Sequence, residues 1–513
     1  MPFRSRILKM AIFATGLSGI VAEYILSTLA TYFLGDSVMQ WTLIVSIMMF
    51  SMGLGSRISK YFQGNLLQIF IFIEFALSLV VAYSSIIAYT AAAFTIYTGA
   101  IIYTLSILIG LMIGMEIPLV IRLNNSFEIL RVNISSVMEQ DYYGSLAGGL
   151  FFAFIGLPYL GITFTPFVLG MINFVVALSL FFILRPKIKK HIRISVQLAS
   201  IVVGATIILG FFVAEPIILF GEQKKYKDKV IFEEQSRYQK IVMTQWKDNY
   251  WLFINGNQQL STLDEAMYHE PMVHPVMKTV QYPQQVLILG GGDGCAAREV
   301  LKYKVTEQIT LVDLDPVMTE LGKNHPVMVE MNENALNNAR VSIVNKDAYK
   351  FLSETNRFYD VIIIDLPDPK TIELGRMYSK EFYRLCYKHL RPGGAMVTQA
   401  GSPYFATRAF RCIDKTVAAA GFETVQLHNQ ILTLGEWGWI MGVKEGTNER
   451  VKAHLHKLQF DDIETHWINN EAMKLITSFG KDYYGQEVGK VEVNKIHNPV
   501  LYKYYLNGNW DLY

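Results

Sequence analysis

The sequence predicts a two-part chain: an N-terminal multi-span α-helical membrane domain and a C-terminal α/β domain with a doubly wound parallel sheet. Residues 1–220 are mostly apolar, whereas residues 221–513 have the composition of an ordinary soluble domain. Several apolar runs in the first part reach the roughly 20 residues that a transmembrane helix needs. After residue 284, short apolar strands alternate with helical stretches, which indicates a parallel sheet.

Composition limits the classes of partner. The chain has 513 residues, enough for two or more domains, and a net charge of only +2, which favours no nucleic-acid partner. Only 18% of the residues are charged, against about 25% in soluble proteins. The three cysteines, Cys295, Cys386 and Cys412, have no CxxC or metal-ligand spacing. The sequence therefore predicts neither a disulfide framework nor a metal site.

Residues 1–220 contain about seven candidate transmembrane helices. They cover approximately 8–34, 38–56, 66–89, 93–121, 143–160, 162–184 and 195–220. Basic residues precede the first run in MPFRSRILKM, and no small-residue cleavage site follows it. We therefore interpret this run as a membrane span and not as a removed signal peptide.

The basic residues predict how these helices are oriented. Lysine and arginine collect before the first span and after the second, fourth and sixth, which places the N-terminus in the cytoplasm. Seven spans would then place residues 221–513 outside the cell. The four lysines that follow the seventh span favour the inside instead. They are Lys224, Lys225, Lys227 and Lys229.

Three acids, Glu23, Glu74 and Glu116, lie within the apolar runs. A carboxylate inside a bilayer is costly, so it usually has a partner or a task. One interpretation is a path or a site for a cationic amine. The other, which we favour, is hydrogen bonding between helices or a position near the membrane interface.

The C-terminal half divides into a small β-strand domain, residues 221–283, and a main α/β domain, residues 284–513. In the small domain, the strands QKIVMTQW and YWLFI flank a polar break, and Asn255-Gly256 indicates a tight hairpin turn. In the main domain we expect buried strands at 286–290, 309–313, 341–344, 361–365 and 395–399. Ligands bind at the carboxyl ends of such strands, so the residues there are the candidate site residues.

The first of these strands ends in a glycine-rich loop, Gly290-Gly291-Gly292-Asp293-Gly294. Glycines allow a tight turn and a close approach to a ligand. The spacing is GxGxG and not the GxGxxG of dinucleotide-binding sites, and Asp293 would repel a phosphate. The acid indicates a cationic ligand instead.

Two further aspartates stand at the ends of the next strands. Asp313 can accept hydrogen bonds from both hydroxyls of a ribose, and Asp347 can hold an adenine amino group. Together with the glycine loop they predict an adenosyl ligand. The alternative is a glycine turn followed by two aspartates that cap helices.

The fourth strand ends in DLPDP (365–369), which places two carboxylates in one cleft. Methyl transfer does not generally need such a pair, but alkylation of an amine does. A primary amine has a pKa near about 10, so at neutral pH it stays protonated until a base removes the proton. The segment TLDEAMYHE (262–270) adds three acids, Asp264, Glu265 and Glu270. These acids predict a polyamine acceptor beside a sulfonium donor.

The motifs together resemble the spermidine synthase family of polyamine aminopropyltransferases. The matching segments are SRYQKIV (236–242), LFINGNQQLSTLDEAMYHE (252–270), LILGGGDG (287–294), LVDLD (311–315), KDAYKFL (346–352), YDVIIIDLPDP (359–369) and MYSKEFY (377–383). They occur in the family's order and spacing over about 236–400. The N-terminal helices and GEWGW (435–439) resemble the membrane-fused branch of that family.

The resemblance implies a class I methyltransferase-like Rossmann fold. It also implies transfer of the aminopropyl group of decarboxylated S-adenosylmethionine to an amine such as putrescine, giving spermidine and methylthioadenosine. No cofactor is implied beyond this co-substrate. Asp365 would be the general base. The donor would be bound by Gln239, Asp264, Gly290, Gly292, Asp313, Asp347 and Ala348. The acceptor side would be formed by Tyr238, His269, Asp293 and Asp368, although His269 judged without the resemblance is a satisfied polar residue under the hairpin.

The sequence also departs from the soluble members of that family. Leu366 and Pro367 stand where those members have small polar residues, and KTIELGR (370–376) replaces a Gly-Pro-containing stretch that covers the site. An acceptor-side aromatic residue is not evident around 431–435. Two other functions stay open: an S-adenosylmethionine-dependent methyltransferase, against which the acids argue, and a membrane polyamine sensor or transporter with a relic enzyme domain.

The implied partners are the polyamine, the adenosyl donor and the lipid bilayer, and a homodimer is left open. The donor is made inside cells. We therefore expect a multi-pass protein of the cell membrane whose C-terminal half faces the cytoplasm, although a strict count of seven spans places it outside.

Overall fold

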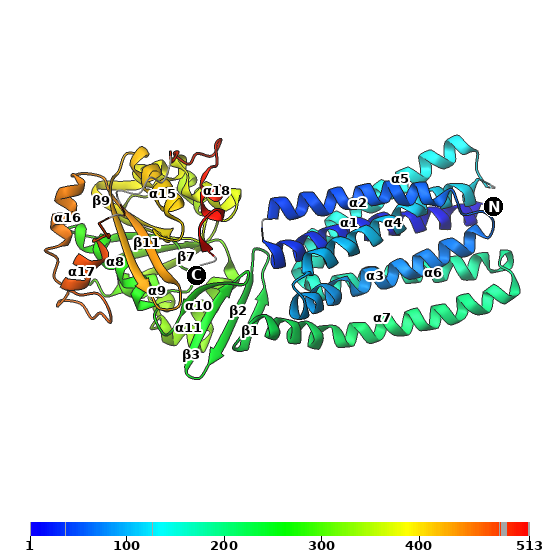
Figure 1. Cartoon of the computed structure of the whole chain (residues 1–513), viewed down its shortest axis with the longest axis horizontal. Helices are drawn as coiled ribbons and strands as arrows, with labels where there is room; N and C mark the ends of the chain where they lie inside the picture. Colours follow the sequence, from blue (N-terminus) through cyan, green and yellow to red (C-terminus); the bar gives the residue numbers. More distant parts are fainter. Residues whose placement is uncertain (1, 36, 126, 482, 484–489, 511–513) are drawn as a thin grey trace. The chain divides into compact units, whose positions relative to one another are not determined.

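The computed structural model describes the chain except for residues 1, 36, 126, 482, 484–489 and 511–513. The chain divides into two compact units, Met1–Val230 and Ile231–Tyr513 (Figure 1). The first is built from long helices, and the second combines sheets with shorter helices. We call them the helical unit and the α/β unit.

In the described part of the chain, the helical unit has seven α-helices. They are α1 Pro2–Leu34, α2 Ser37–Ser59, α3 Leu66–Phe94, α4 Thr98–Asn124, α5 Leu130–Phe151, α6 Gly161–Leu184 and α7 Lys190–Lys225. A π-helical segment, η1 Phe152–Leu160, joins α5 to α6 and ends at Gly161, whose φ is 62°. Six helical stretches are long and apolar enough to cross a membrane, with Leu130–Leu184 counted as one of them.

Glycines let several of these helices pack with their backbones in contact. A Cβ atom added to Gly55 of α2 would lie 2.1 Å from the carbonyl oxygen of Leu111 in α4. A Cβ atom added to Gly144 of α5 would lie 2.0 Å from the carbonyl oxygen of Phe13 in α1. Such small-residue contacts are typical of apolar helices that pack closely.

A four-stranded sheet with strand order β1-β2-β3-β4 begins the second half of the chain. Its strands are β1 Lys229–Gln235, β2 Lys240–Trp246, β3 Asn249–Ile254 and β4 Asn257–Ser261. Strands β3 and β4 pair antiparallel, and Asn255 and Gly256 join them with φ values of 49° and 77°. Two positive φ values are what the tight hairpin turn of an Asn-Gly pair requires.

A seven-stranded sheet with the order β10-β11-β9-β8-β5-β6-β7 forms the centre of the α/β unit. The strands are β5 Gln285–Gly290, β6 Gln308–Asp313, β7 Val341–Asn345, β8 Tyr359–Asp365, β9 Leu390–Gly401, β10 Glu423–Ile431 and β11 Gly435–Val443. Strands β5 to β9 pair in parallel, whereas β11 runs antiparallel to β9 and β10. The sheet is therefore mixed and not wholly parallel as predicted. The short connection 432–434 explains this, because only an antiparallel hairpin can close over so few residues.

Helices cover both faces of this sheet. The helices of the α/β unit are α8 Ala266–Thr279, α9 Cys295–Leu301, α10 Pro316–Asn324, α11 Pro326–Met331, α12 Ala348–Glu354, α13 Ile372–Gly375, α14 Lys380–His389, α15 Thr407–Ala419, α16 Asn448–Leu455, α17 Asn470–Ile476 and α18 Leu501–Leu506. Alternate residues of β5 enter opposite cores, with Val286 in one and Leu287 in the other. Burial on both faces explains why the strands are continuous apolar runs.

The strand order positions the site. Strand β5 lies between β6 and β8, so the carboxyl ends of these three strands are adjacent. Gly290, the last residue of β5, is paired with Asp365, the last residue of β8. Ligands of open α/β sheets bind at such a point, where neighbouring strands lead to opposite sides.

Candidate active site

A cavity of about 340 Å³ lies at the carboxyl ends of β5, β6 and β8. Residues of β3, β4 and the start of α8 line its other side. Most of the residues predicted for the site lie in this lining: Tyr238, Gln239, His269, Gly290, Gly292, Asp293, Asp313, Asp347, Ala348, Asp365 and Asp368. Asp264 is the predicted site residue that the structure places outside it.

The glycine-rich loop passes directly against the ends of the neighbouring strands. A Cβ atom on Gly290 would lie 1.9 Å from the carbonyl oxygen of Asp365, and the φ of Gly290 is 85°. A Cβ atom on Gly292 would lie 2.7 Å from the carboxylate of Asp313. Both positions therefore require glycine, because any side chain would displace a strand end that carries an acid.

Asp313 is held in place by backbone donors. The N–H of Gly292 donates to Oδ2 at 3.1 Å, and the N–H of Asp315 donates to Oδ1 at 2.8 Å. Burial raises the pKa of Asp313 to about 6, although these two hydrogen bonds act in the opposite direction. Each carboxylate oxygen keeps a lone pair for another donor, so Asp313 can still receive the two hydroxyls of a ribose.

Asp347 both caps a helix and lines the cavity. Its Oδ1 accepts a hydrogen bond from the N–H of Lys350 at 2.8 Å, and its Oδ2 accepts one from Arg376 at 2.6 Å. Ala348, the first residue of α12, is buried in the cavity lining. The capping interpretation of Asp347 and its place in the lining are therefore compatible.

Asp365 is the half-buried acid at the end of β8. The hydroxyl of Tyr268, from α8, donates to its Oδ1 at 2.8 Å. Burial raises the pKa of Asp365 to about 6, and the nearby charge of Asp293 acts in the same direction. A carboxyl group with this pKa is largely ionised at neutral pH and can accept a proton from a substrate.

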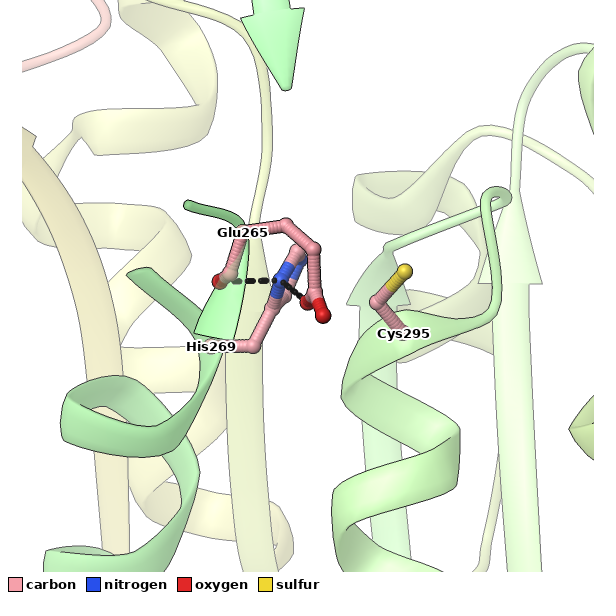
Figure 2. Close-up of side chains that lie close together, drawn as sticks. All are labelled: Glu265, His269 and Cys295. Atoms are coloured by element: carbon pink, nitrogen blue, oxygen red, sulfur yellow. Dashed lines mark hydrogen bonds and ion pairs between the residues drawn. The ribbon is translucent and has the colours of Figure 1, made fainter. Parts of the chain in front are cut away.

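His269 belongs to a buried ion-pair cluster beside Asp365. Its Nδ1 lies 2.9 Å from Oε2 of Glu265, and Arg298 donates to both oxygens of Glu265 at 2.9 Å. Its Nε2 lies 3.8 Å from Oδ1 of Asp293. Burial acts to lower the pKa of His269, but the hydrogen bond to Glu265 and the charge of Asp293 outweigh it and raise the pKa to about 9. Figure 2 shows the ring beside Glu265, with Cys295 across from them.

Three groups of side chains bring metal-ligand atoms within 4.8 Å of one another, two of them wholly buried and the second partly buried. They are Glu265-His269-Cys295, His269-Asp293-Asp365 and Glu270-His274-Glu299. In the first, Glu265 is already occupied by Arg298, and burial raises the pKa of the Cys295 thiol well above its usual range, which makes it a poor ligand. In the third, the carboxylate of Glu270 accepts hydrogen bonds from the backbone of residues 466–468. These two groups fit ion-pair and hydrogen-bond networks better than a metal.

Asp368 is contacted by a residue from the C-terminal part of the chain. The hydroxyl of Tyr505, in α18, donates to its Oδ2 at 2.7 Å. Gln399 donates to its Oδ1 at 3.4 Å, and Nζ of Lys370 lies 3.7 Å from Oδ2. Asp368 therefore already has polar partners at this end of the cavity.

Two regions in which the sequence departs from the soluble family also reach the cavity. Leu374 and Met377, from KTIELGR and the residue after it, lie in the lining. Trp437 and Leu434 line it from the β10–β11 hairpin. The sequence showed no evident acceptor-side aromatic residue around 431–435, but Trp437, two positions further on, lines the cavity.

Asp264 points away from the cavity. Its Oδ2 accepts a hydrogen bond from the N–H of Thr433 at 2.6 Å, and its Oδ1 accepts one from the Thr433 hydroxyl at 3.1 Å. It therefore ties the start of α8 to the β10–β11 hairpin. Both of its carboxylate oxygens are engaged within the protein.

Known proteins are similar to this chain in sequence. The family model described as "Spermine/spermidine synthase domain" matches residues 265–453. Polyamine aminopropyltransferase 2 of Aquifex aeolicus (strain VF5) is 42% identical over 506 residues, which cover 98% of each chain. The polyamine aminopropyltransferase of Oceanobacillus iheyensis is 37% identical and covers 99% of this chain and 98% of its own. This chain belongs to the polyamine aminopropyltransferase family.

The prediction of an aminopropyltransferase is therefore confirmed. The match to both relatives extends over nearly the whole length, so it includes the helical unit. A crystal structure of a spermidine synthase in complex with the transition-state analogue AdoDATO is 25% identical, with a TM-score of 0.46 over 50% of this chain and 88% of that chain.

Among the polar residues of the enzyme's cavity region that were not predicted from the sequence are Tyr268, Gln399 and Tyr505. Tyr268 stands in the motif YHE beside His269, so the motif itself carried the signal. Tyr505 had no such signal, because it is 137 residues away from Asp368 in the sequence. It also lies beyond the residues that the family model matches.

Proposed function

We propose that the enzyme transfers the aminopropyl group of decarboxylated S-adenosylmethionine to a primary amine such as putrescine, forming spermidine and methylthioadenosine. This proposal rests on the charge of the cavity. Six aspartates line it, and among the described residues no lysine or arginine does. Both substrates are cationic at neutral pH, so an acidic cavity attracts them. Intact S-adenosylmethionine has a carboxylate that these acids would repel.

The donor occupies the side of the cavity formed by the glycine-rich loop. In this proposal Asp313 binds the ribose hydroxyls, and the adenine lies at Asp347 and Ala348. The remaining donor contacts come from Gln239, Gly290 and Gly292, which line the same cavity. Asp264 has a different task from the one that the resemblance implies: it positions the hairpin that carries Leu434 and Trp437, since Thr433 occupies its oxygens.

Asp365 acts as the general base. It accepts a proton from the acceptor ammonium, and the neutral nitrogen then attacks the aminopropyl carbon that is bonded to the sulfonium sulfur. The new C–N bond forms as the C–S bond breaks, and the bonding pair goes to sulfur, which leaves as neutral methylthioadenosine. Because the pKa of Asp365 is raised to about 6, it differs less from the pKa of a primary amine, which is about 10. The smaller difference favours this proton transfer.

In this proposal the acceptor is bound by Asp368 and Tyr238, which line the same cavity. Asp368 binds the distal ammonium group, and Tyr505 holds the carboxylate in position through its hydroxyl. Asp293 and His269 lie beside Asp365 and in this proposal face the reacting amine groups. Glu265 and Arg298 fix the orientation of His269.

We also propose that the helical unit spans the cell membrane and that residues 221–513 face the cytoplasm. Six helical stretches have the length and composition for this, and the donor is a molecule of the cell interior. The four lysines between 224 and 229 favour the cytoplasmic side. Labelling of an introduced cysteine near Lys227 with a membrane-impermeant reagent tests this side, and reaction in intact cells would contradict it.

We further propose that residues 221–513 fold and bind the donor without the helical unit, because the strands and the cavity lie within that span. A truncated protein that binds methylthioadenosine supports this. Aggregation of every truncation near residue 221, even in detergent, would contradict it.

The function is tested by supplying the purified full-length protein with two donors in one mixture. Decarboxylated S-adenosylmethionine and S-adenosylmethionine are labelled differently and offered with a panel of di- and polyamines. Mass spectrometry should find amines that have gained an aminopropyl group and none that have gained a methyl group. Methylated products would support the methyltransferase alternative, and binding without any product would support the sensor or transporter.

A further inference from the structure

Two acids of the helical unit lie in its interior, remote in sequence from the catalytic residues. Glu74 of α3 and Glu116 of α4 are both 0% exposed. Their carboxyl groups are close enough to interact electrostatically. Neither oxygen of Glu74, and only one oxygen of Glu116, has a hydrogen-bond partner among the described residues.

The surroundings of this pair hold polar groups but no compensating positive charge. Helices α1, α2, α5, α6 and α7 pack against α3 or α4. Asp141 of α5 is a further acid whose charge acts on Glu116. Within the described helices, no lysine or arginine forms an ion pair with either carboxyl, and Lys9 of α1 is bound to Glu128 at 2.7 Å.

An apolar core cannot hold both groups as carboxylates without donors. Burying one unpaired charge already costs many kcal/mol, and a second like charge beside it adds repulsion. A proton on one carboxyl removes its charge and provides an O–H that can donate to the other. The pair therefore retains a proton.

Thr15 of α1 can form a hydrogen bond with Glu116 in either protonation state of that carboxyl group. Its hydroxyl oxygen lies 3.0 Å from the carbonyl oxygen of Ala11 and is also hydrogen-bonded to Oε2 of Glu116. A hydroxyl has one proton and can donate to only one of these acceptors at a time. When Glu116 is ionised, Thr15 donates to it. When Glu116 is protonated, Glu116 donates to Thr15, and Thr15 donates to Ala11.

We propose that Glu74, Glu116 and Thr15 form a proton-binding site in the core of the helical unit. The site takes up and releases a proton, and the Thr15 contact is kept in both states. It goes beyond aminopropyl transfer, since none of its residues lines the catalytic cavity. Glu128 provides a matched control in the same unit, because its carboxylate has Ser5 and Lys9 as partners.

Dicyclohexylcarbodiimide is the probe for this site. This apolar reagent reacts with a protonated carboxyl group: the proton passes to a carbodiimide nitrogen, the oxygen bonds to the carbodiimide carbon, and the adduct rearranges to a stable N-acylurea. Full-length protein in liposomes is labelled at a series of pH values from mildly acidic to alkaline. The labelled glutamate is then identified by mass spectrometry of peptides. This measurement uses the wild-type protein, so a folding defect of a variant cannot affect it.

We expect the label on Glu74 or Glu116 at neutral pH and its loss at alkaline pH, with no label on Glu128. Glu128→Gln should leave the label unchanged, and the double variant Glu74→Gln/Glu116→Gln should lose it. Thr15→Val should extend labelling to higher pH, because the ionised form of Glu116 loses its donor. Absence of label from both residues across the pH series would overturn the proposal. Protection by sodium ions at constant pH would also overturn it, since the pair would then hold a metal cation in place of a proton.

Discussion

Both units hold carboxyl groups that are partly or wholly buried, but the two units differ in the hydrogen-bond donors that these groups receive. In the α/β unit, Asp313 receives two backbone N–H groups and Asp365 receives the hydroxyl of Tyr268. In the helical unit, Glu74 has no hydrogen-bond donor among the described residues. A buried carboxylate with donors can remain ionised, whereas one without donors keeps its proton. The difference separates a site built to bind cationic substrates from one built to hold a proton.

The largest effect is expected from Asp365→Asn. This change keeps the shape of the side chain and an acceptor for Tyr268, but it removes the base. Turnover should fall about 10²–10⁴-fold, while calorimetry shows nearly unchanged donor binding. Asp462→Asn, at an exposed carboxylate paired with Lys278, is the control for the chemical change. Near-normal activity of Asp365→Asn at neutral pH would rule out its role as the base.

A smaller loss is expected from Asp313→Ala, measured as binding of methylthioadenosine. Removing an ionised hydrogen-bond acceptor costs on the order of 1.5–3 kcal/mol. Glu74→Gln is the contrasting change, because that acid lies in the helical unit and should leave the affinity for methylthioadenosine as it is. Unchanged affinity in Asp313→Ala would mean that the ribose is held elsewhere.

The pH dependence of kcat at saturating donor tests the ionisation of the base, because saturation removes the contribution of Asp313, whose pKa is also raised to about 6. Since burial raises the pKa of Asp365 to about 6, protonation below that pH removes the base and activity falls. The loss approaches about tenfold for each further pH unit. Above about pH 6 Asp365 is ionised, so this acidic fall in activity should be absent. The residual activity of Asp365→Asn should not show it, and a wild-type profile that stays flat well into the acidic range contradicts the assignment.

The smallest effect is expected at the acceptor end. Tyr505→Phe removes one hydrogen bond to Asp368 and should weaken acceptor binding by about 1 kcal/mol. The change should appear in the KM for the acceptor and hardly in kcat. Tyr504→Phe is the neighbouring control, since its ring packs against Arg408 and not against Asp368. Equal behaviour of the two variants would show that Tyr505 does not position Asp368.

Positions along the strands were predictable from the sequence, but side-chain directions were not. Asp313 and Asp365 follow continuous apolar runs, and the parallel sheet brings the ends of those runs together. His269 and Asp264 belong to one short motif, yet His269 lines the cavity and Asp264 turns to Thr433. Spacing in a motif places a residue, whereas the packing of distant segments decides where its side chain points.

Contacts between distant segments explain the remaining differences. Tyr505, in the C-terminal part of the chain, contacts Asp368, and no local sequence pattern predicts such a contact. The antiparallel hairpin β10–β11 changes the sheet from wholly parallel to mixed, because its short turn overrides the alternation of strand and helix seen before it. In the helical unit, hydropathy located the helices, while the partners of Glu116 depend on how α1 and α4 pack.

The central claim is that the acidic cavity performs aminopropyl transfer. The most direct measurement is the stoichiometry of products formed by the purified full-length enzyme from decarboxylated S-adenosylmethionine and putrescine. We predict equal amounts of methylthioadenosine and spermidine, both abolished together in Asp365→Asn. Methylthioadenosine without an aminopropylated amine, or neither product despite tight donor binding, would contradict the account.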